Sequence, residues 1–187
     1  MRFEVSRVLD AIERRLSTDP VLTRAVLDLS EVVRYADLDG GRTASVLRLG
    51  MVIDALGRHL SEDNVPVYVV AERALLSDPD LTSNERMVVR RWADDGLVEV
   101  LAAAPGDRVL EVAELAGLPV LSRQGFDRWR DRYGWLGAEP GRLLAPVVGH
   151  GGAALVPRVP GRPAAPRPGG PPLLARLWRC PEADCPS

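Results

Sequence analysis

The chain has 187 residues, of which 46% are hydrophobic and 27% charged, and its formal net charge at pH 7 is -2. A domain of this size can bury a core without disulfide bonds, and the small net charge excludes a general electrostatic attraction to nucleic acids. No window approaches the roughly 18 to 20 apolar residues that a membrane-spanning helix requires, so we expect no membrane partner.

Arginine supplies all 24 basic residues, and lysine does not occur. Nucleophilic catalysis by lysine, including Schiff-base chemistry, is therefore excluded. The arginine usage, together with the abundance of alanine, glycine and proline, is typical of a GC-rich bacterial genome. The opening sequence MRFEVSRVLDAIERR lacks the continuous apolar stretch of a signal peptide. We therefore expect a cytoplasmic bacterial protein.

Helices and strands alternate along the first half of the chain. Apolar residues at helical spacing predict a first helix that ends before Asp19-Pro20, because the residue before a proline disfavours the α region. Thr82 and Glu85 have the spacing of a capping box, which marks a helix start. The predicted elements are, in order, a helix over 5–16, a strand over 25–30, a helix over 46–60, a strand over 65–70 and a helix over 82–94.

The alternation continues in the second half and ends in a predicted hairpin. The predicted elements are a strand over 97–101, a helix over 107–116, a strand over 118–122, a short aromatic helix after 125, and a strand over 143–148 paired with 154–156. Such alternation predicts one α/β domain over residues 1–156, with a mostly parallel central sheet and helices on both faces. Residues 157–172 are a linker rich in proline, glycine and arginine, and residues 173–187 form a short tail.

Two aspartates occupy positions where α/β proteins place their chemistry. Asp28 follows the apolar run at the end of the first predicted strand, and Asp107 opens a later helix. Strand ends and helix starts of a parallel sheet share one edge, so the two carboxylates can face each other there. A buried Asp28 needs a metal ion, hydrogen bonds or an arginine such as Arg108 or Arg123. The alternative role for Asp107 is a helix N-cap.

The order of these features resembles the PIN-like nucleases, most closely their NYN and Regnase-type branch. The matching features are the acid at the end of the first strand, the Gly-Asp-Arg helix start at 106–108, and the segment LPVLSRQGFDRWRDRYGWLG at 118–137. The resemblance covers roughly residues 24–148. It implies a PIN-like three-layer α/β sandwich.

The resemblance also implies a metal-dependent ribonuclease. In it, Asp28 and Asp107 would bind Mg²⁺ or Mn²⁺, Glu31 would assist catalysis, and water would attack an RNA phosphodiester. Ser122 matches the family serine, whereas Gln124 stands where the family has an aspartate. The site is degenerate at that position. We therefore expect weakened RNA cleavage or, as the alternative, an inactive module that binds RNA or a protein partner.

Two further features suggest binding. Cys180 and Cys185 have a spacing that occurs in zinc sites, but two thiolates supply only half of a tetrahedral Zn²⁺ site. A complete site would need a second chain, which suggests a homodimer or a protein partner joined through the tail. The alternatives are a reduced pair or a short disulfide loop. The arginines and aromatic residues of segment 126–135 offer stacking surfaces for RNA, although we expect Phe126 and Trp129 to pack in the core.

Overall fold

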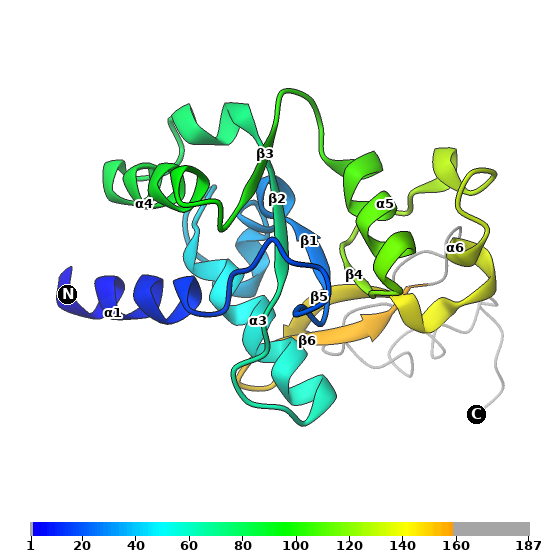
Figure 1. Ribbon diagram of the computed structural model, residues 1–187. Helices are drawn as coiled ribbons and strands as arrows, with labels where there is room; N and C mark the ends of the chain where they lie inside the picture. The colour runs from blue at the N-terminus through cyan, green and yellow to red at the C-terminus, as the bar shows by residue number, and fades with distance from the viewer. Residues whose placement is uncertain (1, 159–187) are drawn as a thin grey trace, which may run out of the picture.

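A six-stranded sheet with the order β3-β2-β1-β4-β5-β6 organises the protein in a computed structural model that describes residues 2–158 (Figure 1). The strands are β1 (Val26–Asp28), β2 (Tyr68–Glu72), β3 (Glu99–Leu101), β4 (Val120–Leu121), β5 (Leu143–Gly149) and β6 (Gly152–Pro157). Strands β1 to β5 pair in parallel, and only β6 is antiparallel to its neighbour β5. The predicted α/β class with a mostly parallel sheet is therefore confirmed.

Helices surround this sheet. The α-helices are α1 (Arg2–Glu13), α2 (Leu29–Val32), α3 (Leu47–Leu60), α4 (Ser83–Asp94), α5 (Gly106–Ala116) and α6 (Trp135–Ala138). The 3₁₀ turns are η1 (Ala36–Leu38), η2 (Arg73–Ser77), η3 (Asp127–Trp129) and η4 (Pro140–Arg142). None of the helices within residues 2–158 is long and apolar enough to cross a membrane.

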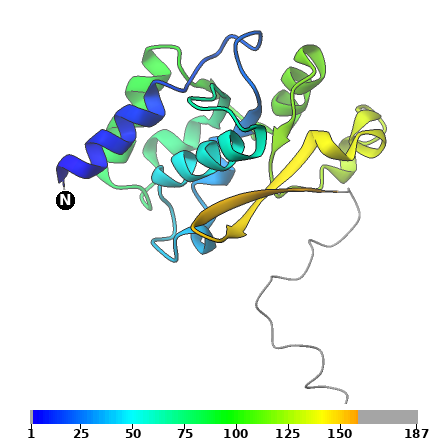
Figure 2. The ribbon, with the colours of Figure 1, turned by 90° about the horizontal axis from the view of Figure 1, so that it is seen from below.

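The central strands divide the interior into two cores, because successive side chains of a strand point to opposite faces. Leu27 packs in a core with residues of α1, α3 and α4, whereas Val26 packs in a second core with residues of α5 and segment 126–136. Figure 2 shows α1, α3 and α4 gathered on one side of the molecule and α5 and α6 on the other. Asp28 follows these two residues, so both cores fix its position.

Local sequence signals located several elements correctly. The predicted capping box is present, since Thr82 and Glu85 each accept a hydrogen bond from the backbone of the other. Gly117 ends α5 in the left-handed conformation at φ 66°, which glycine adopts without steric cost. The predicted hairpin at the C-terminal end of the sheet is also present as β5 and β6.

Other boundaries differ from the prediction. Helix α1 ends at Glu13, because Leu16 instead forms an isolated parallel bridge with Val67 and is buried. Strand β1 ends at Asp28, where that side chain caps α2. The short aromatic helix is replaced by η3 and α6. Phe126 precedes η3 with φ 52°.

The aromatic side chains of this segment pack mainly inward. Phe126 is 4% exposed, as predicted for a core residue, and Trp129 is half-buried against the second core. The predicted linker beyond Arg158, together with Cys180 and Cys185, lies outside the described residues. The zinc half-site therefore stays a prediction.

Candidate functional site

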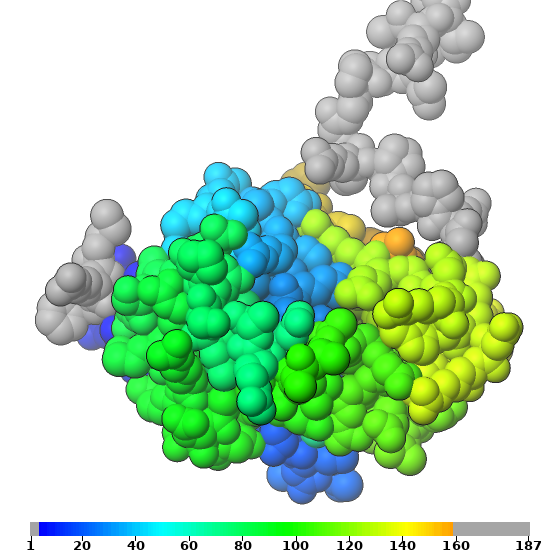
Figure 3. Space-filling view, turned by 90° about the horizontal axis from the view of Figure 1, so that it is seen from above, coloured from blue at the N-terminus to red at the C-terminus, as the bar shows by residue number. Residues whose placement is uncertain are grey.

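The carboxyl ends of the parallel strands β1 to β4 lead into the candidate site, an edge that we call the carboxyl edge. Figure 3 shows this part of the surface, with the blue segment after β1 lying between green segments and the yellow-green segment after β4. Strand β1 lies between β2 and β4, so the residue that ends β1 is central. In open parallel sheets, ligands bind outside these strand ends.

Asp28 ends β1 and is only 7% exposed. Its Oδ1 accepts a hydrogen bond of 2.8 Å from the backbone N–H of Ser30, which fixes the carboxylate at the start of α2. Burial, followed by the neighbouring charge of Glu31, raises the pKa of Asp28 to about 6. The site thus holds a carboxylate whose charge is destabilised by its surroundings, a condition common at functional sites.

Glu31, three residues further along, is the centre of a hydrogen-bond network. Its Oε2 accepts from the hydroxyl of Ser122 at 2.7 Å and from the side-chain amide of Gln124 at 3.4 Å. Its Oε1 accepts from the backbone N–H of Arg123 at 2.9 Å and from the hydroxyl of Tyr35. Glu31 therefore ties α2 to the turn that follows β4.

Tyr35 supports this network through its hydroxyl group. Burial raises the pKa of Tyr35 above its usual range, and the charge of Glu31 adds to the shift, so the hydroxyl remains a donor. The guanidinium of Arg123 lies 4.1 Å from the centre of the Tyr35 ring. Its Nε donates to the backbone carbonyl of Pro146 at 2.7 Å. The turn after β4 is thus held by α2 and by β5.

Neither of the arginines proposed as partners of Asp28 contacts it. Arg123 instead forms a salt bridge of 2.7 Å with Asp37, and Arg108 forms one of 2.9 Å with Glu99. Within residues 2–158, Asp28 has no ion pair with any arginine. Neither Arg108 nor Arg123 therefore neutralises the Asp28 carboxylate.

Asp107 lies at the same edge of the sheet but has other partners. It sits in the first turn of α5, while Pro105 occupies the N-cap position, so the N-cap interpretation is wrong. Its carboxylate forms hydrogen bonds of 3.0 and 2.9 Å with Arg132 and accepts one of 3.0 Å from the Tyr133 hydroxyl. Burial, followed by hydrogen bonding to Asp107, raises the pKa of Tyr133 to about 12. The structure brings Asp28 and Glu31 together, whereas Asp107 turns toward the segment after β4.

The acidic residues of the site suit a weakly held divalent ion better than a resident one. No group of three or more His, Cys, Asp or Glu side chains in residues 2–158 is arranged to hold a metal ion. Mg²⁺, however, commonly binds through one or two carboxylates, several waters and the phosphate oxygens of a ligand. The unneutralised Asp28 beside Glu31 fits that mode. Gln124 contributes an amide in place of a further carboxylate.

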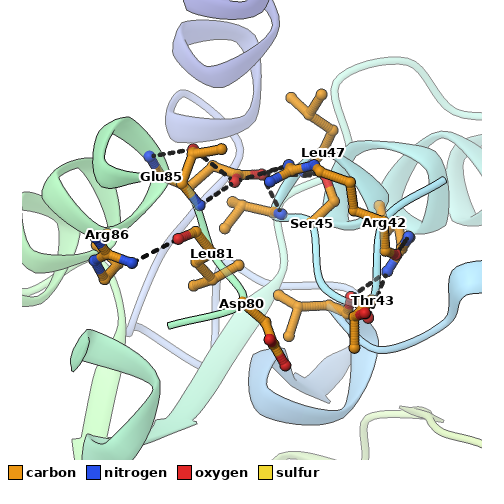
Figure 4. Close-up of polar contacts among 12 residues, drawn as sticks. Arg42, Thr43, Ser45, Leu47, Asp80, Leu81, Glu85 and Arg86 are labelled. Carbon is orange, nitrogen blue, oxygen red and sulfur yellow. Dashed lines mark hydrogen bonds and ion pairs between the residues drawn. The ribbon is translucent and has the colours of Figure 1, made fainter. Parts of the chain in front are cut away.

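Sequence reasoning did not anticipate the wider network around Glu85, which is 2% exposed. Its carboxylate accepts hydrogen bonds from Arg42, from the hydroxyl of Ser45 and from the backbone N–H of Val46, in addition to the Thr82 cap. Figure 4 shows the Glu85 side chain reaching from α4 to the segment that carries Arg42 and Ser45. These contacts lower the pKa of Glu85, although burial opposes them. Because both of its carboxylate oxygens accept hydrogen bonds from protein groups, Glu85 has a structural role and joins α4 to the segment that carries Arg42 and Ser45.

Comparisons with known proteins identify the fold. No family model matches the sequence, and no curated protein matches it. Two solved structures of Arabidopsis thaliana nuclear protein-only RNase P 2 (PRORP2) are similar, each at 16% identity, with TM-scores of 0.53 and 0.54. The similarity covers 83% and 82% of this chain but 33% of each PRORP2 chain. The protein therefore has the fold of this part of PRORP2, a PIN/NYN-like α/β sandwich, and it spans about a third of the length of PRORP2.

Proposed function

We propose that the protein is a divalent-metal-dependent ribonuclease that cleaves RNA phosphodiesters at Asp28. The observation that carries this proposal is the buried Asp28 carboxylate beside the half-buried Glu31, at the central strand end of a PIN/NYN-like sheet, with no arginine side chain paired to either acid within residues 2–158. Holding a buried carboxylate next to a second negative charge is costly, and a divalent cation would relieve that cost.

The metal in this proposal is Mg²⁺ or Mn²⁺, held by Asp28 together with oxygens of the RNA phosphate. When bound, such an ion polarises the phosphate and lowers the pKa of an attacking water. The protein contributes orientation. The Ser30 amide fixes the Asp28 carboxylate, and the donors of Ser122, Tyr35 and the turn after β4 fix Glu31 beside it.

Asp107 has a conditional role in this mechanism. Its carboxylate is 48% exposed and is paired with Arg132, which is 61% exposed. An exposed pair of this kind contributes little to stability, so the carboxylate can leave Arg132 at small cost when a cation approaches. We assign Asp107 as the second acid on this basis, with Glu31 as the assisting residue.

RNA is the proposed substrate because the fold is shared with PRORP2, whose name identifies it as an RNase P. The substrates of the whole PRORP2 protein are not transferred, since two thirds of that chain lie outside the similarity. The net charge of -2 gives no general attraction to RNA, so recognition must depend on local groups at the carboxyl edge.

The direct test is cleavage of a mixture of single-stranded and hairpin RNA with Mn²⁺ or Mg²⁺. The wild type, Asp28→Asn and Asp107→Asn are compared with Asp54→Asn, a control at an exposed acid of α3 that pairs with Arg15. We expect cleavage by the wild type and the control, with loss in Asp28→Asn and reduction in Asp107→Asn. Equal cleavage by every preparation would indicate a contaminating nuclease. Binding without cleavage would favour the inactive RNA- or protein-binding module.

A further inference from the structure

Most arginines at the carboxyl edge are neutralised by acids, and two are not. Arg34, Arg108, Arg123 and Arg132 each form salt bridges. Arg73 and Arg128 are exposed, and neither has a carboxylate partner within residues 2–158. In a protein with net negative charge, such unpaired cations are the groups that remain available for an anion.

The two arginines follow the strands on either side of β1. Arg73 is the first residue of η2, directly after β2, in which Val70 is paired with Asp28. Arg73 comes three residues after Val70, which places it roughly 10 Å from Asp28 along the strand direction. Arg128 lies in η3, which follows β4, the other neighbour of β1. Asp28 thus lies on the strand between them.

The position of Arg128 is fixed by stacking. Its guanidinium carbon lies 3.9 Å from the centre of the Trp129 ring. That ring in turn packs on Gly106 at the start of α5, where a Cβ atom would come within 2.9 Å of it. A stacked guanidinium keeps its N–H groups in its own plane, where they can donate to two phosphate oxygens at once. The small glycine therefore allows Arg128 to be held near the start of α5.

We propose that Arg73 and Arg128 bind phosphates of single-stranded RNA on opposite sides of Asp28. The proposal rests on the proposed function, in which the phosphate to be cleaved lies at Asp28, and it adds the residues that hold the strand. Backbone phosphates fit this arrangement because the acidic pair lies between the two arginines. The arginines can bind the flanking phosphates of an RNA strand separately from the phosphate that lies at the acidic pair. Contacts of this kind give affinity without base specificity.

The test is the salt dependence of RNA binding, measured by fluorescence anisotropy with a labelled single-stranded oligonucleotide. EDTA is present, so metal-dependent cleavage does not alter the probe. Each phosphate contact to a single strand contributes about 0.7 to the slope of log K against log salt concentration. We expect Arg73→Gln and Arg128→Gln each to reduce the slope by about 0.7, and the double variant to reduce it by about twice as much.

Arg7→Gln and Arg14→Gln are matched controls, because Arg7 is exposed on α1, Arg14 is exposed directly after its end, and neither has a carboxylate partner within residues 2–158. We expect no change in their slopes. Arg73→Lys should keep the wild-type slope, since it keeps the charge. The proposal is overturned if the wild type does not bind RNA, or if edge and control variants behave alike. Loss of slope in the edge variants, together with no cleavage by the wild type in the separate Mn²⁺ or Mg²⁺ assay, would refute the nuclease proposal alone.

Discussion

The carboxylates of Asp28 and Glu31 lie beside each other at the end of β1, yet they are held in different ways. Asp28 caps α2 by accepting a hydrogen bond from its backbone, whereas Glu31 receives hydrogen bonds from both the turn after β4 and Tyr35. The protein therefore immobilises Glu31 strongly and leaves Asp28 with few partners. This division of roles leads to four predictions.

We predict that Asp28→Asn stabilises the folded protein at neutral pH. The pKa of Asp28 rises from 3.8 to about 6 on folding, so the native state binds the proton more tightly and the wild type loses stability as the pH rises through this range. The amide removes the charge and still caps α2, for a gain of at most about 3 kcal/mol. Urea unfolding at pH 7 should show this gain, and it should vanish as the pH falls below about 3.8, where Asp28 is protonated in both states. A destabilised variant at pH 7 would contradict the prediction.

We predict that Mn²⁺ raises the melting temperature of the wild type and leaves that of Asp28→Asn unchanged. A ligand that binds only the folded state stabilises it by about 2.7 kcal/mol at a hundredfold excess over its Kd. Because the ion competes with the proton on Asp28, the stabilisation should fall as the pH drops below about 6. Thermal scans at several pH values measure both effects, and Asp54→Asn should respond like the wild type. An equal response of Asp28→Asn would place the metal elsewhere.

We predict that Gln124→Asp strengthens divalent binding. The side-chain amide of Gln124 lies 3.4 Å from Glu31 Oε2, so an acid there adds negative charge close to the Asp28–Glu31 pair. A nearby unit charge interacts with a cation by a few kcal/mol, which corresponds to at least about tenfold in affinity. Isothermal titration with Mn²⁺ measures the change. Gln124→Asn is the neutral control, and equal affinities for the two variants would show that charge at this position is irrelevant.

We predict that Tyr35→Phe destabilises the fold by about 1.5 to 3 kcal/mol, the range for a hydrogen bond to a charged group. The buried hydroxyl of Tyr35 donates to Glu31 and accepts from the backbone N–H of Arg123, so its loss removes two hydrogen bonds from the network. Tyr68→Phe is the matched control, because its acceptor Glu99 retains Arg108. Denaturant unfolding should show a smaller loss for Tyr68→Phe than for Tyr35→Phe.

The sequence predicted those elements whose signals are local. A capping box is complete within four residues, and Thr82 and Glu85 behaved as their spacing indicated. The end of α1 was misplaced because the bridge between Leu16 and Val67 depends on a strand far along the chain. Helical periodicity contains no information about such a partner.

The position of Asp28 was predictable, while its environment was not. An acid after an apolar run indicates a strand end, and that inference was correct. Three partners of Glu31 come from a turn 91 to 93 residues away, and the directions of Arg108 and Arg123 depend on acids in other elements. These contacts follow from tertiary packing, which composition and spacing do not determine.

Successive side chains of β1 pack into different cores, so the backbone at Asp28 is connected to both cores. Val26 is anchored to the α5 side and Leu27 to the side of α1, α3 and α4, with no exposed surface on either residue. Any shift of one core relative to the other is therefore transmitted to the acid within one or two residues. Substitutions deep in either core, far from the carboxyl edge, should displace the Asp28 carboxylate before they unfold the protein.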